Sequence, residues 1–228
     1  MIQRRVFVFW FGPKMTLTRR RAFWLLRRRA QVPIQLVGPG NLQDWILKEE
    51  PLHPAFCYLS STHQSDYLRA YFMLNYGGGY SDVKPLTFDW TPFFRTLDSS
   101  RYQFVGYPEF GPDGVAGGPQ VAENWSQLAG ACYYIFRPRS EFAGEWLHRI
   151  HNILDEIQPK LLKHPGNFHP RAVRGGVFQP KTAQEKQMRS EYPLEWTQIN
   201  GSIFHPLQLD FIGEFGRELP QVRWRRYR

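Results

Sequence analysis

Cysteine is scarce in this 228-residue chain, which contains only Cys57 and Cys132. The two lie far apart in apolar surroundings, and neither belongs to a CxxC pair or to a spacing typical of metal ligands. This excludes a disulfide-rich scaffold and a cysteine-based zinc site. We interpret both residues as buried, reduced thiols, with a disulfide between them as the less favoured alternative.

Long hydrophobic runs are also missing. No segment approaches the roughly 20 apolar residues that a helix needs to cross a bilayer. The N-terminus MIQRRVFVFWFG has basic residues before a short apolar run, but it lacks the h-region length and the small-residue cleavage site of a signal peptide. We therefore expect a cytoplasmic protein. With 42% hydrophobic residues the chain can bury a core of ordinary size, and its length favours a single domain.

Acidic residues are outnumbered, because 20 Asp and Glu face 29 Lys and Arg, giving a net charge of +9. Such an excess predicts an anionic partner. The arginine triplets at 19–21 and 27–29 enclose an apolar stretch with Trp24, and RWRRYR ends the chain. This pattern is typical of peripheral contact with an anionic membrane, of nucleic-acid binding or of a solvated helix face. Nucleic acid is the less favoured partner, since no RRM, KH or zinc-finger signature is present.

The hydrophobic pattern predicts an α/β fold with a Rossmann-type mixed sheet flanked by helices. Residues 4–10, RRVFVFW, indicate a strand buried on both faces. Thr16 can cap a helix, and VPIQLV follows as a second strand. Strand, helix and strand in this order form a βαβ unit. In such sheets ligands bind beyond the carboxyl ends of strands, which singles out 10–12.

The rest of the chain continues this alternation. We predict further strands at 55–59, 80–83, 101–107 and 131–136. We predict helices that begin near Asn41, that start at Ser65 or Asp66 and end at Gly77, and that span 140–164 with a bend or break at Pro159. Residues 164–186 indicate a long polar loop, and 192–206 a helix-like run followed by a short strand.

The segment His63-Gln-Ser-Asp-Tyr-Leu-Arg69, followed by AYFMLNYGGGYSDVKP, contains the most informative residues. Asp66 and Arg69 are three positions apart, so they share one face of the predicted helix. The carboxylate of Asp66 accepts hydrogen bonds and the planar guanidinium of Arg69 donates them, a combination that suits sugar hydroxyls or a phosphate. The three glycines allow a sharp turn and a close approach to a ligand, and Asp82 follows at a strand end. Taken singly, these residues also fit an N-cap, its i+3 partner and a tight turn.

The segment SDYLRAYFMLNYGGGYSD resembles the sugar-binding region of glycosyltransferases with a DXD motif, a group that includes capsular polysaccharide synthesis proteins and initiation mannosyltransferase-like enzymes. Their sequences run S-D-x-x-R, an aromatic-rich helix, G-G-x-Y and then D-x-D. Weaker similarity covers VFVFWFG, HPAFCYLS and YPLEWTQINGSIFHP. The resemblance implies a GT-A fold that transfers a sugar from a nucleotide-diphosphate sugar to a glycan or lipid-linked acceptor, with donor binding in about 1–110 and acceptor binding in about 111–228.

Carried over by position, the resemblance implies contacts with the substrate for Trp10, Asp66, Arg69, Gly78, Gly79, Tyr80 and Asp82. Trp10 would pack on the nucleobase. Asp66 and Arg69 would hold the donor sugar, and Asp82 would contact the sugar and the ribose.

Lys84 departs from the family pattern, because it stands where the second aspartate usually ligates a divalent metal. A lysine there repels Mg²⁺ or Mn²⁺, and we predict no metal ligands, although either ion remains an alternative if another carboxylate completes a site. The lysine can instead neutralise the leaving diphosphate, an attraction of about 4 kcal/mol at 4 Å. We therefore take Asp82, Lys84 and Glu195 as catalytic candidates. Glu195 would bind or activate the acceptor, and an exposed structural carboxylate is the equal alternative. A catalytically inactive glycan- or nucleotide-binding relative is the second interpretation, and a basic nucleic-acid-binding protein is the third.

Overall fold

One mixed sheet of six strands organises the computed structural model, which describes residues 2–166 and 191–222. The strands lie in the order β2-β1-β3-β5-β4-β6. Their bounds are β1 Val6–Phe9, β2 Ile34–Val37, β3 Gly78–Ser81, β4 Phe104–Pro108, β5 Ala129–Phe136 and β6 Phe215–Gly216. β5 runs antiparallel to both of its neighbours, and every other pairing is parallel.

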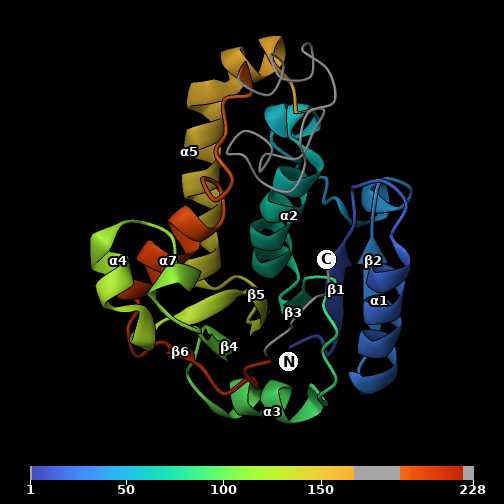
Figure 1. Cartoon of the computed structure of the whole chain (residues 1–228), viewed down its shortest axis with the longest axis vertical. Coiled ribbons are helices and arrows are strands. Elements are labelled where there is room, and N and C mark those ends of the chain that lie inside the picture. Colours follow the sequence, from blue (N-terminus) through green and yellow to red (C-terminus); the bar gives the residue numbers. More distant parts are fainter. Residues whose placement is uncertain (1, 167–190, 223–228) are drawn as a thin grey trace.

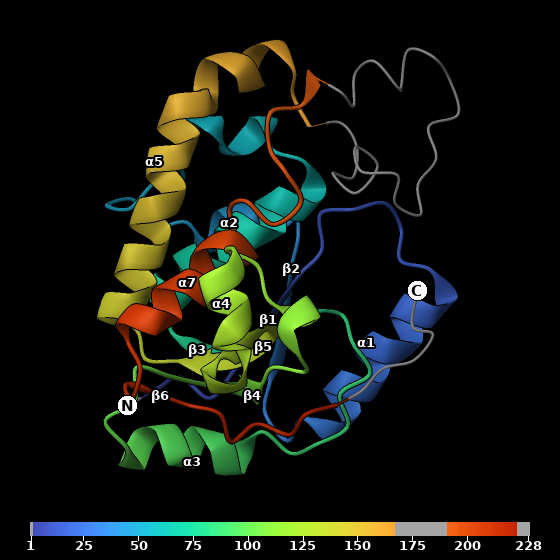
Figure 2. The same ribbon diagram turned by 60° about the vertical axis from the view of Figure 1, so that its left-hand side comes forward.

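Helices cover both faces of this sheet (Figures 1 and 2). The α-helices are α1 Leu17–Arg29, α2 Ser61–Asn75, α3 Thr91–Ser99, α4 Pro119–Glu123, α5 Glu141–Lys163 and α7 Gly201–Asp210. The 3₁₀ turns are η1 Leu42–Trp45, η2 Pro54–Tyr58, η3 Pro112–Gly114 and η4 Trp125–Gln127. The predicted class, a single α/β domain with a Rossmann-like mixed sheet, is confirmed.

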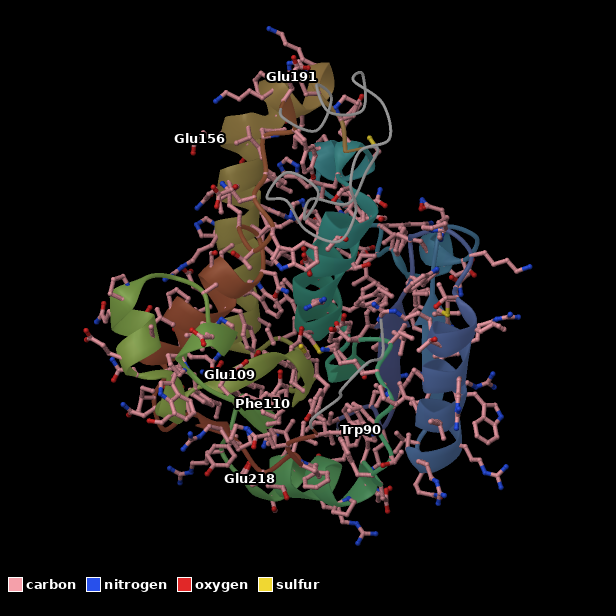
Figure 3. All side chains as sticks on the ribbon, viewed as in Figure 1. Trp90, Glu109, Phe110, Glu156, Glu191 and Glu218 are labelled. Atoms are coloured by element: carbon pink, nitrogen blue, oxygen red, sulfur yellow. The ribbon has the colours of Figure 1, made fainter. Side chains whose placement is uncertain are left out.

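Strand β1 separates two hydrophobic cores, which explains why its sequence is apolar at every position. Phe7 and Phe9 point to the face covered by α2, α5 and α7. Val6 and Val8 point to the opposite face, where α1 and α3 pack. Trp90, fully buried just before α3, fills that second core (Figure 3). Because alternate side chains of a strand face opposite sides, only a continuous apolar run can bury both.

The middle of the sheet brings distant segments to one edge. β1 and β3 are parallel neighbours, so Trp10 and Asp82 leave the sheet at the same edge. Asp82 N donates to the Cys132 carbonyl, which continues the pairing of β3 with β5. β5 belongs to the second half of the chain but lies between β3 and β4, so the predicted donor and acceptor parts share one sheet.

Two local predictions before β3 are wrong. Residues 55–58 belong to the 3₁₀ turn η2, with Leu59 as its C-cap, instead of a strand, because Pro54 fixes the first position and the His53 ring accepts a hydrogen bond from Ala55 N. Helix α2 begins five or six residues earlier than predicted, since Ser60 is its N-cap and accepts from His63 N at 3.3 Å. Ser65 and Asp66 therefore lie inside the helix.

Later in the chain, α5 continues through Pro159 as one helix. The strand predicted within 192–206 is absent from the described residues of that range, because its apolar positions face the core from α7. Cys57 is exposed and Cys132 half-buried, so only the reduced state of the two thiols is as predicted. Most of the 164–186 loop and the RWRRYR end lie outside the described residues. Within 2–166 and 191–222, no helix is both long and apolar enough to cross a membrane.

The tight packing around Gly79 gives a first prediction. A Cβ at this position would lie 2.8 Å from Val6 Cγ2 and 3.2 Å from the Trp90 ring. We expect Gly79→Ala to lower the free energy of unfolding by about 1–3 kcal/mol, measured by urea denaturation. Gly40→Ala is the control, because a Cβ there meets no atom within 4 Å. Equal stability of the two variants would contradict the packing role.

Candidate active site

Helix α2 and strand β3 bring the sequence motif together through a very short connection. The middle of α2 carries Asp66 and Arg69 on its buried face. The helix ends at Asn75 with Tyr76 as its C-cap, and Gly77 follows with a φ of +59°, a conformation that glycine adopts without strain. Strand β3 begins at the next residue, so Asp82, directly after β3, returns to the level of Arg69.

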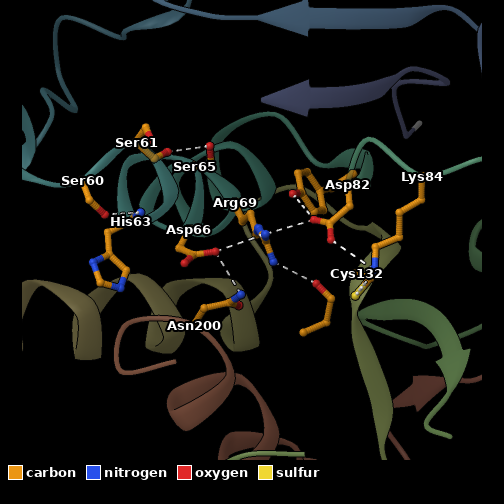
Figure 4. Close-up of polar contacts among 12 residues, drawn as sticks. Ser60, Ser61, His63, Ser65, Asp66, Arg69, Asp82, Lys84, Cys132 and Asn200 are labelled. Carbon is orange, nitrogen blue, oxygen red and sulfur yellow. Dashed lines mark hydrogen bonds and ion pairs between the residues drawn. The ribbon is translucent and has the colours of Figure 1, made fainter. Parts of the chain in front are cut away.

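The guanidinium of Arg69 joins the parts of this site (Figure 4). Its Nη2 lies 3.1 Å from Asp66 Oδ1 and 3.0 Å from Asp82 Oδ1. Nη1 donates to the Ala131 carbonyl on β5 at 3.0 Å, and the group lies over the Tyr80 ring, 4.7 Å from its centroid. One cation therefore holds two carboxylates, and it fixes α2 against β5.

Asp82 is the partly exposed carboxylate of the pair, and cations surround it. The Tyr80 hydroxyl donates to Oδ1 at 2.7 Å, while Lys84 Nζ lies 3.6 Å from Oδ2. Burial alone would raise the pKa of Asp82, but Arg69, Lys84 and the Tyr80 hydrogen bond outweigh it, and the pKa is lowered from its ordinary value. Lys84 Nζ also donates to Cys132 Sγ at 3.2 Å. Asp82 is therefore ionised at neutral pH, and a buried ammonium stands beside it.

Asp66 behaves in the opposite way although it shares the same arginine. Its side chain is only 4% exposed. Burial, reinforced by the charge of Asp82, raises the pKa of Asp66 to about 6, against the effects of Arg69 and of a hydrogen bond from Asn200. Near pH 6 this carboxyl carries a proton in about half of the molecules, so it can donate as well as accept a hydrogen bond.

The C-terminal segment closes the site from the side of α7. Asn200, the residue before α7, donates from Nδ2 to Asp66 Oδ1 at 3.0 Å. His63 is fully buried and bonds to the Tyr192 hydroxyl at 2.8 Å and to the Glu195 carbonyl at 3.0 Å. Glu195 itself carries an exposed side chain. The structure thus connects residues 192–200 to α2 across more than 100 positions of sequence.

Three buried polar atoms around this cluster have no hydrogen-bond partner within the described part of the chain. They are Arg69 Nε, Tyr134 Oη and Asn200 Oδ1. Buried polar atoms are nearly always paired in folded proteins. Donors and acceptors in this arrangement suit water molecules or the hydroxyl groups of a ligand.

The structure brings five of the predicted residues into one connected cluster, which consists of Asp66, Arg69, Tyr80, Asp82 and Lys84. Trp10 lies at the same sheet edge, and its indole nitrogen donates to the Pro13 carbonyl at 2.7 Å. Arg19 lies over the Trp10 ring at 5.9 Å and donates to the Val83 carbonyl at 3.0 Å. Trp10 is therefore linked to the Asp82 strand end through Arg19.

Gly78 and Gly79 lie in buried strand β3, where packing already accounts for both glycines. A Cβ on Gly78 would lie 2.9 Å from the Arg5 carbonyl, and Gly78 has a φ of +78°. A Cβ on Gly79 would meet Val6 and Trp90. Contact of these glycines with a ligand stays a prediction.

The donor atoms of the cluster do not fit a divalent metal. Asp66 already binds Arg69 and Asn200, and the ammonium of Lys84 lies against Asp82. Among the described residues, no group of three or more His, Cys, Asp or Glu side chains gathers into a possible metal site. A hard cation needs several free oxygen ligands, and the positive charges beside Asp82 oppose it.

Residues that sequence reasoning gave no role complete the arrangement. His63, Tyr134 and Asn200 contact the cluster or hold the segment that does. Asn200 stands within a segment that resembles the glycosyltransferases, and His63 is the first residue of the informative His63–Arg69 segment. Tyr134 carried no such signal, because a tyrosine in an apolar strand is typical of the hydrophobic core.

The sequence matches no model of a known protein family, and no curated protein matches it either. The functional interpretation therefore depends on the geometry of the site and on the motif resemblance.

The raised pKa of Asp66 gives a second prediction. Below pH 3.8 this carboxyl is protonated in both the folded and the unfolded protein, and its contribution to stability is complete. As the pH rises from 3.8 to about 6, the unfolded protein loses the proton while the folded protein retains it, so the contribution to stability is lost. We expect the stability of the native protein, relative to Asp66→Asn, to fall by roughly 2 kcal/mol between pH 4 and 7. Denaturant unfolding at several pH values measures this difference. Parallel curves for the two proteins would show that Asp66 has an ordinary pKa.

Proposed function

We propose that this protein is a glycosyltransferase that takes a sugar from a nucleotide-diphosphate sugar, and that Lys84 replaces the usual metal ion. The observation that carries the proposal is the connected cluster of Asp66, Arg69, Asp82 and Lys84 at the carboxyl end of β3. In open α/β sheets this edge is where ligands bind. The spacing of these residues is the one by which the sequence resembles DXD glycosyltransferases.

The reaction needs positive charge where the diphosphate departs. Two buried cations, Arg69 and Lys84, flank the partly exposed Asp82, and Arg19 lies close enough to lower the pKa of Asp82 further. When Asp66 carries its proton, these three cations face a single negative charge. A positively charged, preorganised site of this kind stabilises a leaving diphosphate without the reorganisation that water would need.

Recognition of the sugar is assigned to the other side of the cluster. Asp66 can donate or accept, and the unpaired atoms of Tyr134 and Asn200 lie around it. Hydroxyl groups of a sugar match this mixture of donors and acceptors. Asp82 is ionised and partly exposed, so it is placed to accept from the sugar or the ribose and to stabilise an oxocarbenium-like centre. The acceptor, a glycan or a lipid-linked saccharide, is assigned to the side of residues 192–200.

One observation favours a second candidate, a glycan- or nucleotide-binding protein without catalysis. Lys84 is occupied by Asp82 and Cys132, and its side chain is only 6% exposed. A lysine with these two contacts stabilises the fold even if no diphosphate binds to it. Turnover distinguishes the two candidates, and donor binding is common to both.

The proposal is tested by the release of UDP or GDP from a panel of nucleotide sugars, with Mn²⁺ and with EDTA in parallel. We expect release that survives EDTA, because Lys84 supplies the positive charge. Release only with Mn²⁺ would refute the metal-free mechanism. Binding of a nucleotide sugar without release would favour the non-catalytic candidate.

Lys84→Met removes the ammonium and keeps most of the side-chain volume. We expect turnover to fall roughly a hundredfold, because one preorganised charge at the leaving group is lost. Lys14→Met is the matched control, since Lys14 is exposed and the charge change is identical. The comparison requires that both variants still unfold cooperatively, as a folded protein does. Wild-type turnover in Lys84→Met would remove the lysine from the mechanism.

Lys84→Asp tests the metal argument without depending on activity. The change creates the second carboxylate of a D-x-D pattern and removes the charge that opposes a cation. We expect this variant to bind Mn²⁺, seen as loss of the free-ion signal in electron paramagnetic resonance, whereas the native protein leaves the signal unchanged. Equal Mn²⁺ binding by both proteins would show that Lys84 does not exclude the metal.

A further inference from the structure

Helix α1 presents an unusual outer surface. Its sequence LTRRRAFWLLRRR holds six arginines and no acidic residue. Only Ala22 and Leu26 are fully buried, and they pack on the core beneath α1. The other side of the helix faces outward at the edge of the molecule, beside β2 (Figures 1 and 2).

Six exposed residues of α1 form one stripe of mixed character. Leu17, Arg21, Trp24 and Arg28 are spaced i, i+4, i+7 and i+11, which places them on one face of a helix. Their flanks carry further exposed arginines. We call this set the α1 stripe: Leu17, Arg20, Arg21, Trp24, Arg27 and Arg28.

Two features of the α1 stripe point to the chemistry of its partner. Leu17 and Trp24 are 76% and 54% exposed, which is high for large apolar side chains. The arginines of the stripe form no ion pair among the described residues, and Arg28 lies over the Trp24 ring at 5.2 Å. A surface that needs both negative charge and apolar contact at the same place fits the headgroup region of an anionic membrane.

We propose that the α1 stripe is a docking surface for a membrane with anionic lipids, on which α1 lies in the plane of the headgroups. Trp24 and Leu17 enter the interface, and the four arginines bind lipid phosphates around them. Nucleic acid is the other polyanion that a basic helix can bind, but it gives Leu17 no apolar partner. The observations therefore favour the membrane.

Docking in this way has a consequence for the candidate site. α1 follows the carboxyl end of β1, so its N-terminal end lies at the sheet edge that carries Asp82. Arg19, in the first turn of α1, donates to the Val83 carbonyl next to Asp82. A docked α1 would hold this edge close to the membrane surface.

The test is sedimentation of the full chain with vesicles of phosphatidylcholine, with or without phosphatidylglycerol, in the absence of any sugar donor. We expect binding only to the vesicles with phosphatidylglycerol. Arg21→Glu/Arg28→Glu should weaken this binding at least tenfold, since one arginine near an anionic surface contributes roughly fivefold. Trp24→Ala should weaken it several-fold at equal net charge.

The matched control is Arg95→Glu/Arg101→Glu, which makes the same change of net charge at two exposed arginines outside α1. We expect this control to lose much less binding than the α1 variant. Equal loss in both double variants would overturn the proposal, because net charge alone would then explain the binding. Failure of the native protein to bind anionic vesicles, with α1-dependent binding of an RNA oligomer instead, would also overturn it. Neither result depends on whether the protein transfers a sugar.

Discussion

The buried guanidinium of Arg69 is the interaction on which the arrangement of the site depends. Its Nη atoms reach α2, the end of β3 and the backbone of β5, and its face lies on Tyr80. Burial alone would lower the pKa of this arginine, but the neighbouring tyrosines and carboxylates raise it well above its ordinary value, so the group stays charged. A buried charge is tolerated only where partners surround it, and removing one partner would leave the others uncompensated. The geometry of the cluster therefore behaves as one unit.

The two carboxylates bound by Arg69 show how position separates their chemistry. Asp66 is enclosed, and burial dominates its pKa. Asp82 is partly exposed, accepts from Tyr80 and has Lys84 as a second cation, so its pKa moves the other way. Pairs of acids whose surroundings separate their pKa values are typical of sites where one group is ionised while the other keeps a proton. The same cation thus supports two different protonation states.

The two faces of the sheet support different parts of the molecule. The face with α2, α5 and α7 contains the larger core and encloses the buried pair of Asp66 and Arg69. The face with α1 and α3 contains the second core, and its outer helix carries the α1 stripe. β1 contributes side chains to both cores, so it connects the two faces of the sheet. Its carboxyl end leaves the sheet toward the site, where Arg19 lies over the Trp10 ring and donates to the Val83 carbonyl.

Local sequence determined those features that depend on short-range chemistry. The strand within residues 4–10 and the capping of α1 by Thr16 were predictable, as was the i, i+3 relation of Asp66 and Arg69. Residues 55–59 were misjudged, because a proline and a histidine cap decide between a strand and a 3₁₀ turn at short range. Only the tertiary structure decided that Arg69 reaches both Asp82 and β5, that Asn200 meets Asp66 and that Lys84 is buried beside Cys132. These contacts join residues between 13 and 134 positions apart, and no local pattern encodes a pairing that the packing of the whole sheet creates.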